Sequence, residues 1–241
     1  MKYLLIAILS CSSLLAVAQA NPGMESGIFR LEKGFFDSRQ VMIGRKVPPA
    51  EVVGDYYLDT TWHQGTFTMK DGRRSATYPL RYDIENALLE VRWNGQLKVV
   101  GEEYLSCFHW SEGAAEQKRT FVNGLQFRVA QSPVSGFLEL AYQGSDSVLV
   151  SYGTYLKQPD YVAGLDMGSR HPEIIKTKQL YILANGVMHE IKGRKDFLNY
   201  ADRLPKKVLK SWIKKQKLNL KNASDLARLM KYYETNNDLL E

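Results

Sequence analysis

Residues 57–100 constrain the fold most strongly, because they alternate apolar and polar side chains with the period of two of a half-buried β-strand. The alternating segments are 66–70, 79–84, 89–93 and 97–99. Asp71-Gly72 and Asn94-Gly95 lie between them, and both dipeptides favour tight hairpin turns because they accept positive φ. The pattern predicts an antiparallel β meander with one apolar and one solvated face.

Strand-like segments continue to residue 191, with turn residues between them. We predict strands at 104–110, 120–122, 126–130, 137–143, 148–152, 179–184 and 187–191, with turns at Asn123-Gly124, Gly144-Ser145-Asp146 and Asn185-Gly186. Segments 28–31 and 40–43 are candidate edge strands, 111–118 is a predicted loop, and 155–170 a predicted long connection. No helical pattern separates the strands, which excludes a parallel α/β sheet.

The hydrophobic period changes from two to that of a helix at Lys192. A short helical turn is expected at 196–201, Pro205 suits the first position of a second helix, and Asn222 suits the N-cap of a last helix. We therefore predict a mainly β (α+β) fold. It comprises an antiparallel β-meander sheet, roll or partly closed barrel at 51–191, an extended arm at 21–50, and a basic helical appendage of two to three helices at 192–241.

Residues 1–20 have the pattern of a secretory signal peptide. Lys2 is basic, residues 4–17 are largely apolar, and Ala18-Gln19-Ala20 is a small-x-small cleavage site. The prediction is an exported protein of the periplasm, cell envelope or extracellular space with no transmembrane span; a membrane anchor or a lipoprotein modified on Cys11 are the alternatives. Loss of the signal would leave Cys107 as the one cysteine, which predicts a small buried side chain and no intramolecular disulfide.

Several motifs together resemble a family of uncharacterised exported bacterial proteins. They are Tyr57-Leu58, the hairpin at 65–72, the Pro-Leu-Arg-Tyr-Asp-Ile strand at 79–84 with the strand at 88–93 behind it, and a Lys-rich helix at 206–217 followed by a helix at 226–233. The resemblance implies an exported compartment and this architecture. It brings no known activity, cofactor or catalytic residue.

The motifs of common enzymes are absent from the sequence. It contains no Gly-x-Ser-x-Gly, no phosphate-binding glycine loop and no Cys-x-x-Cys, and its four histidines lack metal-ligand spacing. Cys107 and His109 share one face of a predicted strand, but a buried cysteine beside a half-exposed histidine is the simpler interpretation. Glu102-Glu103, Glu112 and Glu116 are interpreted as solvated carboxylates. We therefore expect a non-enzymatic protein without catalytic residues, cofactor or metal.

Positive charge is concentrated in one segment. The chain has a net charge of +6, and residues 192–221 hold eleven basic and two acidic side chains. The candidate binding residues follow from it: Lys206, Lys207, Lys210, Trp212, Lys214 and Lys217. Their pattern predicts docking to an anionic envelope component, such as lipopolysaccharide phosphates, acidic polysaccharide or phospholipid headgroups, or to a protein partner. The alternative is that the lysines only keep a packed helix solvated. Lysine without arginine, together with export, disfavours nucleic acid.

Aromatic residues carry the alternative function. Trp62, Trp93 and Trp110 lie on or beside predicted strands, where they can line a cleft in the sheet or fill its core. A cleft of this kind would suit a carbohydrate or small-ligand binding protein or a hydrolase. The sequence leaves strand order, sheet closure and oligomeric state open.

Overall fold

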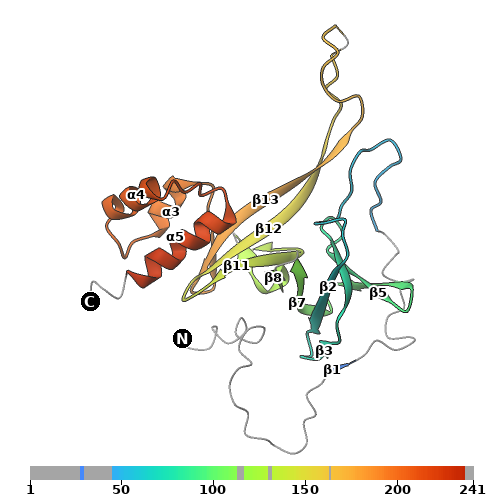
Figure 1. Ribbon diagram of the computed structural model, residues 1–241, viewed down its shortest axis with the longest axis horizontal. Helices are drawn as coiled ribbons and strands as arrows, with labels where there is room; N and C mark the ends of the chain where they lie inside the picture. The colour runs from blue at the N-terminus through green and yellow to red at the C-terminus, as the bar shows by residue number, and fades with distance from the viewer. Residues whose placement is uncertain (1–27, 30–44, 113–116, 130–131, 163, 237–241) are drawn as a thin grey trace, which may run out of the picture.

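A computed structural model describes residues 28–29, 45–112, 117–129, 132–162 and 164–236 of the 241-residue chain (Figure 1). In these residues a large, mainly antiparallel sheet is followed by three helices. The predicted mainly β fold with a C-terminal helical appendage is confirmed. The strands are β1 Ile28–Phe29, β2 His63–Met69, β3 Arg74–Ser75, β4 Tyr78–Asp83, β5 Leu88–Trp93, β6 Gln96–Gly101, β7 Leu105–Glu112, β8 Gln117–Asn123, β9 Arg128–Val129, β10 Ser132–Pro133, β11 Phe137–Gln143, β12 Ser147–Lys157, β13 Glu173–Ala184 and β14 Val187–Glu190.

The strand order departs from a simple meander at one point. The sheet runs β14-β13-β12-β11-β8-β7-β2-β4-β5-β6, so β7 does not continue beside β6 but returns to the other side of β2. There Phe67 of β2 pairs with Phe108 of β7. The short β1 pairs in parallel with β3, which confirms a strand at the start of segment 28–31, whereas segment 40–43 lies outside the described residues. Strands β6 and β14 end the path without pairing with each other, so the sheet is not closed into a barrel.

The Asn-Gly dipeptides behave in two ways. Asn94-Gly95 and Asn185-Gly186 have φ of 48° and 73°, and of 50° and 78°, as the predicted two-residue hairpins require. Asn123 instead keeps an extended φ of −66°, and its side chain accepts a hydrogen bond from the backbone N–H of Leu125 to begin the 3₁₀ turn η1 Gly124–Gln126. The predicted turn at Asn123-Gly124 is present, but it is a capped 3₁₀ turn and not a two-residue hairpin, because β8 pairs with β7 and β11 and not with β9.

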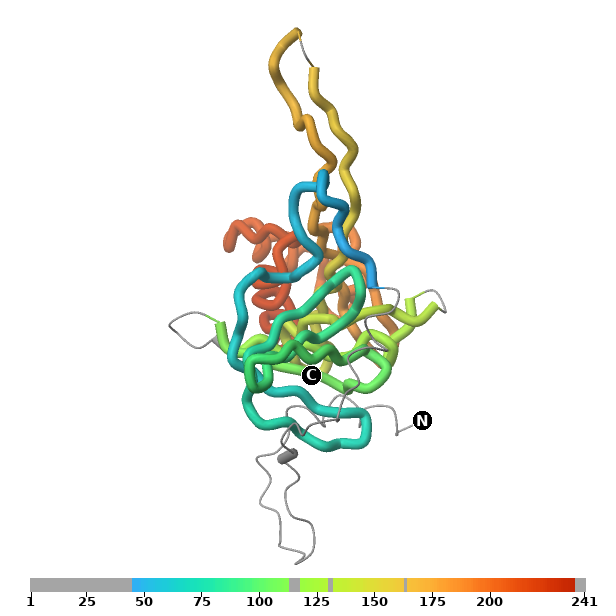
Figure 2. Tube along the Cα trace, turned by 90° about the vertical axis from the view of Figure 1, so that its right-hand side faces the viewer, coloured from blue at the N-terminus to red at the C-terminus, as the bar shows by residue number. Residues whose placement is uncertain are grey.

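The predicted long connection at 155–170 is correct from residue 158 onward, but the strands on both sides of it are longer than predicted. β12 and β13 stay paired from Ser147 with Leu183 out to Lys157 with Glu173, far beyond the strands predicted at 148–152 and 179–184. This two-stranded hairpin projects away from the rest of the molecule (Figures 1 and 2). The outer residues of β12 and β13 do not alternate apolar and polar side chains, so the period of two did not predict these parts of the strands.

Three helices follow the sheet. They are α3 Arg194–Tyr200, α4 Lys206–Lys215 and α5 Ala223–Thr235. Pro205 was predicted as the first residue of a helix and lies one position earlier, at the N-cap of α4. As predicted, Asn222 caps α5, where the asparagine side chain accepts from the N–H of Ser224 at 2.9 Å. No helix among the described residues is long and apolar enough to cross a membrane.

Three hydrophobic cores support this arrangement, the smallest of which joins β8, β11, β12 and β13 around Leu138 and Leu149. The first lies between the helices and β12 and β13, where Leu209, Leu226 and Met230 pack with Val150 and Ile182. The second fills the β2–β8 part of the sheet with an aromatic cluster that includes Phe108 and Phe121, which stack with ring centroids 4.6 Å apart. Tyr152 of β12 packs against the first and the second core. The helices thus share one core with the sheet, which fixes the position of their outer, basic side.

Candidate functional site

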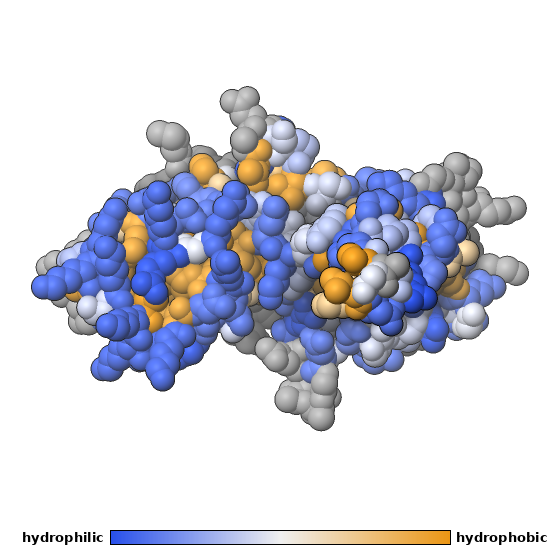
Figure 3. Space-filling view, turned by 90° about the horizontal axis from the view of Figure 1, so that it is seen from above, coloured by the Kyte–Doolittle hydropathy of each residue, from blue (hydrophilic) through white to orange (hydrophobic). Residues whose placement is uncertain are grey.

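A concentration of exposed positive charge lies between α3 and α4. A depression of about 590 Å³ separates these helices, and we call it the basic groove. Its lining consists of four cationic side chains and two others: Arg194, Lys195, Lys206 and Lys210, with Leu198 and Asn199. Figure 3 shows long hydrophilic side chains around an apolar floor over this part of the molecule.

Helical spacing explains why the lysines gather there. Leu209 and Ile213 are buried in the first core and fix the inner side of α4. Lys206, Lys210 and Lys214 follow one another at intervals of four, so they form a single row along an outer side of the helix. Two members of this row reach the groove, where α3 adds the neighbouring Arg194 and Lys195.

The four groove cations are exposed, and within the described part of the chain no carboxylate forms an ion pair with any of them. Elsewhere several cations are paired with carboxylates, as Arg119 is with Glu139 at 2.8 Å. A local excess of unpaired positive charge attracts anions and not cations. The groove is therefore suited to phosphate, carboxylate or sulfate groups.

The predicted binding residues fall into three groups. Lys206 and Lys210 line the groove, whereas Lys207, Lys214 and Lys217 are exposed on α4 or just beyond it without lining the groove. Trp212 does not point freely outward: its ring is half-buried and stacks on Tyr232 with centroids 4.2 Å apart. Arg194 and Lys195 were not among the predicted site residues, although they belong to the same basic segment.

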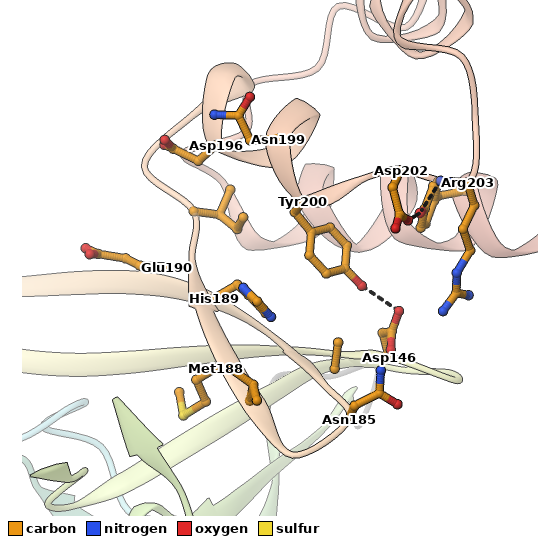
Figure 4. A pocket seen from close by; sticks show the side chains of 14 residues that line it. Asp146, Asn185, Met188, His189, Glu190, Asp196, Asn199, Tyr200, Asp202 and Arg203 are labelled. Carbon is orange, nitrogen blue, oxygen red and sulfur yellow. Dashed lines mark hydrogen bonds between the residues drawn. The ribbon is translucent and has the colours of Figure 1, made fainter. Parts of the chain in front are cut away.

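A second depression, of about 730 Å³, lies on the other side of α3 between β14 and α5 (Figure 4). Its charge is opposite to that of the basic groove, because four carboxylates outnumber one arginine: Asp146, Glu190, Asp196 and Asp202 against Arg203, with His189 also in the lining. We call it the acidic pocket. Asn199 lines both depressions, so α3 separates a basic groove from an acidic pocket.

The innermost carboxylate of the acidic pocket already has a partner. Tyr200 donates its hydroxyl hydrogen to Asp146 Oδ2, as the dashed line in Figure 4 shows. Burial and this carboxylate raise the pKa of Tyr200 above its ordinary value, so the tyrosine stays protonated and neutral. The remaining carboxylates favour a cationic ligand over an anionic one. The contact between Tyr200 and Asp146 serves to join α3 to the β11–β12 turn.

Cys107 and His109 are placed as the simpler interpretation of the sequence expected, a buried cysteine beside a partly exposed histidine. Cys107 is buried, with 1 % of its surface exposed, as predicted. His109 Nε2 contacts Thr66 Oγ1 at 2.8 Å and Arg74 Nη2 at 3.1 Å. Burial, with the nearby charges of Lys118 and Arg74, lowers the pKa of His109 to about 4.

One group of three residues has the composition of a metal site. Asp59, His63 and Glu112 each offer a ligand atom, and these atoms lie within 4.8 Å of one another. The pairing of β2 with β7 brings them together, although their spacing in the sequence gave no sign of it. Their atoms are already engaged, because His63 Nε2 lies 3.0 Å from Asp59 Oδ2 and Arg119 donates to Glu112 at 3.0 Å. A nitrogen and two carboxylates would suit Zn²⁺, but the protein satisfies them itself.

The tryptophans named in the sequence take separate positions. Trp110 is 1 % exposed within the second core, where His63 stacks on it with centroids 4.9 Å apart. Trp62 is half-buried beneath two guanidinium groups, those of Arg81 at 4.5 Å and Arg92 at 4.3 Å from its ring centroid. Trp93 is partly exposed near Lys98. Neither the basic groove nor the acidic pocket contains a tryptophan.

The carboxylates considered in the sequence analysis form local contacts or are exposed. Glu102 accepts hydrogen bonds from the backbone N–H of Gly136 at 2.5 Å and from Ser135 at 3.1 Å, which holds the segment before β11. Glu112 binds Arg119, Glu103 is exposed, and Glu116 lies outside the described residues.

Comparisons with protein-family models, with curated proteins and with solved structures found no match for this chain.

Proposed function

We propose that this protein is an exported, non-enzymatic cell-envelope protein that docks on an anionic envelope component through its basic groove. The single observation that supports the proposal is the lining of that groove: four exposed cations from two helices, with no carboxylate among the lining residues. The signal-like residues 1–20 support export to a compartment where such anionic surfaces occur.

The four groove cations supply enough electrostatic free energy for the protein to bind an anionic surface. A lysine or arginine near an anionic membrane surface contributes about 1 kcal/mol, so four groove cations contribute roughly 4 kcal/mol, or about a thousandfold in affinity at low salt. This attraction decays over a screening length of about 10 Å at 0.1 M salt, so binding of this kind weakens steeply as salt is added. Arginine adds a planar donor fork that suits phosphate and carboxylate oxygens.

The test compares two variants of equal net charge. In the groove variant, Arg194, Lys195, Lys206 and Lys210 are changed to Gln; in the control variant, four exposed lysines elsewhere are changed to Gln: Lys70, Lys118, Lys178 and Lys231. Sedimentation with anionic phospholipid vesicles, lipopolysaccharide and acidic polysaccharide is measured from about 20 to about 300 mM salt, a range over which the screening length falls from about 20 Å to about 6 Å. We expect the groove variant to lose most of its binding to at least one of these anions at low salt.

The control variant distinguishes the effect of the groove from the effect of total charge. It should keep most of the binding of the unaltered chain, because its neutralised lysines are scattered over the sheet and α5. Equal losses in both variants would show that only total charge matters, and the proposed docking site would then be wrong.

A further inference from the structure

The second feature that points outward is the end of the β12–β13 hairpin. We define the hairpin tip as residues 158–162 and 164–172, which lie between the last residue of β12 and the first of β13. Figures 1 and 2 show that the hairpin carries this tip well beyond the body of the molecule. A projecting element of this kind makes its first contact with a surface through the tip.

Hydrogen bonds fix the shape of the tip in advance. The N–H of Val162 donates to the carbonyl of Met167 at 2.8 Å, and the N–H of Asp160 donates to the carbonyl of Ser169 at 3.1 Å. Gly168 has a φ of 95°, and a Cβ there would lie 2.4 Å from the carbonyl oxygen of Asp160. A tip that is ordered before contact loses little conformational entropy on binding.

Three large apolar side chains at this tip are mostly exposed. Val162, Leu165 and Met167 are 52 %, 69 % and 65 % exposed. Figure 3 shows apolar residues at the part of the hairpin nearest the viewer, in the same view that shows the basic groove region. Three exposed aliphatic side chains at one extremity form a surface that water disfavours.

The charges of the tip neutralise one another. Lys157 pairs with Asp160 at 2.8 Å, and Arg170 pairs with Asp166 at 3.0 Å while its guanidinium lies 4.2 Å from the ring centroid of Tyr161. Paired charges and a tyrosine suit the boundary between water and hydrocarbon, where amphipathic side chains keep their polar ends solvated.

We propose that the hairpin tip inserts Val162, Leu165 and Met167 into the interfacial layer of a lipid bilayer. A bilayer fits better than a folded protein partner, because a stable protein interface buries roughly 800 Å² on each side, which a narrow tip of three aliphatic side chains does not offer. Shallow insertion of apolar side chains at the acyl boundary needs no such area. The inference does not depend on the basic groove, because the tip carries no unpaired excess of charge.

The test uses vesicles of zwitterionic phosphatidylcholine, to which the basic groove has no net electrostatic attraction. The tip variant changes Val162, Leu165 and Met167 to Ser in the full chain. The control variant changes three exposed apolar residues of the body, Leu97, Leu125 and Val187, to Ser. We expect the tip variant to sediment with vesicles at least tenfold more weakly than the unaltered chain, and both the control variant and the groove variant to bind these vesicles unchanged.

A second measurement locates the inserted residue. A tryptophan placed by Leu165→Trp should add a fluorescence component that lipids brominated in their acyl chains quench. Absence of binding to zwitterionic vesicles, equal binding of the tip and control variants, or no quenching of the new tryptophan would each overturn the inference. Loss of binding to a protein from the envelope by the tip variant, with lipid binding intact, would overturn it in favour of a protein partner.

Discussion

Arg81 and Glu90 lie opposite each other on β4 and β5, and Arg81 Nη2 donates to Glu90 Oε2 at 2.7 Å. The other oxygen of Glu90 accepts from Arg45 at 2.6 Å and from the hydroxyl of Tyr57 at 3.1 Å. The Glu90 side chain is fully buried, so its charge is compensated by two guanidinium groups and not by water. Arg45 and Tyr57 precede β2, so these contacts attach that segment to β5.

Glu90→Gln should destabilise the protein strongly. The change leaves Arg45 and Arg81 beside a neutral amide in a buried position, and loss of one partner from a buried ion pair costs about 3–5 kcal/mol. Urea unfolding followed by tryptophan fluorescence measures the effect. Glu51→Gln, at an exposed glutamate, serves as the control and should change the free energy of unfolding by less than about 0.5 kcal/mol. Similar values for the two variants would contradict a structural role for the buried carboxylate.

Stability should fall in mild acid because of His109. Burial and nearby cations lower the pKa of His109 to about 4, whereas an unfolded chain binds a proton at a histidine near pH 6.5. The unfolded state therefore binds this proton more readily, and stability declines as pH falls from about 6.5 towards 4. In His109→Gln this part of the decline should disappear, as measured by urea unfolding between pH 7 and pH 4. His171→Gln, at an exposed histidine, should leave the pH profile as it is.

Gly65 should tolerate no side chain. A Cβ on Gly65 in β2 would lie 2.3 Å from the carbonyl oxygen of His109 and 2.8 Å from Leu80 Cδ1, so Gly65→Ala forces β2 and β7 apart. Overpacking of this kind costs about 1–3 kcal/mol. Gly193→Ala is the matched control, because nothing lies within 4 Å of its added Cβ and its φ of 170° is open to any residue. Thermal unfolding compares the two, and equal melting temperatures would show that β2 can shift at no cost.

Local chemistry explains which parts of the fold the sequence predicts. Asn94-Gly95 and Asn185-Gly186 set hairpins through their own backbone preferences, and Asn222 caps α5 through its own side chain. The return of β7 to β2 depends on contacts between Phe67 and Phe108, which are distant in sequence, and alternation gives no sign of which strands pair. Asn123 shows that one dipeptide can serve a hairpin or a cap according to its surroundings.

The candidate sites divide in the same way. Lys206 and Lys210 were predicted because they share one side of one helix, which spacing alone reveals. Arg194 and Lys195 join them only through the packing of α3 beside α4, and one sequence without relatives does not specify that packing. The acidic pocket combines Asp146 with residues of β14, α3 and α5, so no local pattern could have predicted it.

Tyr142 and Glu234 should be energetically coupled, because they join α5 to the sheet below the basic helices. The Tyr142 hydroxyl donates to Glu234 Oε2 at 2.7 Å, and burial together with this carboxylate raises the pKa of Tyr142 to about 12. A double-mutant cycle with Tyr142→Phe and Glu234→Gln should give a coupling of about 1.5–3 kcal/mol at pH 7, as expected for a hydrogen bond to a charged group. An unfolded tyrosine loses its proton near pH 10, so the coupling is complete below that pH and declines as pH rises through about 12. Urea unfolding at pH 7 and pH 11 should therefore show a smaller coupling at pH 11. Additive effects at pH 7 would mean that Glu234 holds the β11–β12 turn through Ser145 and the Asp146 N–H alone.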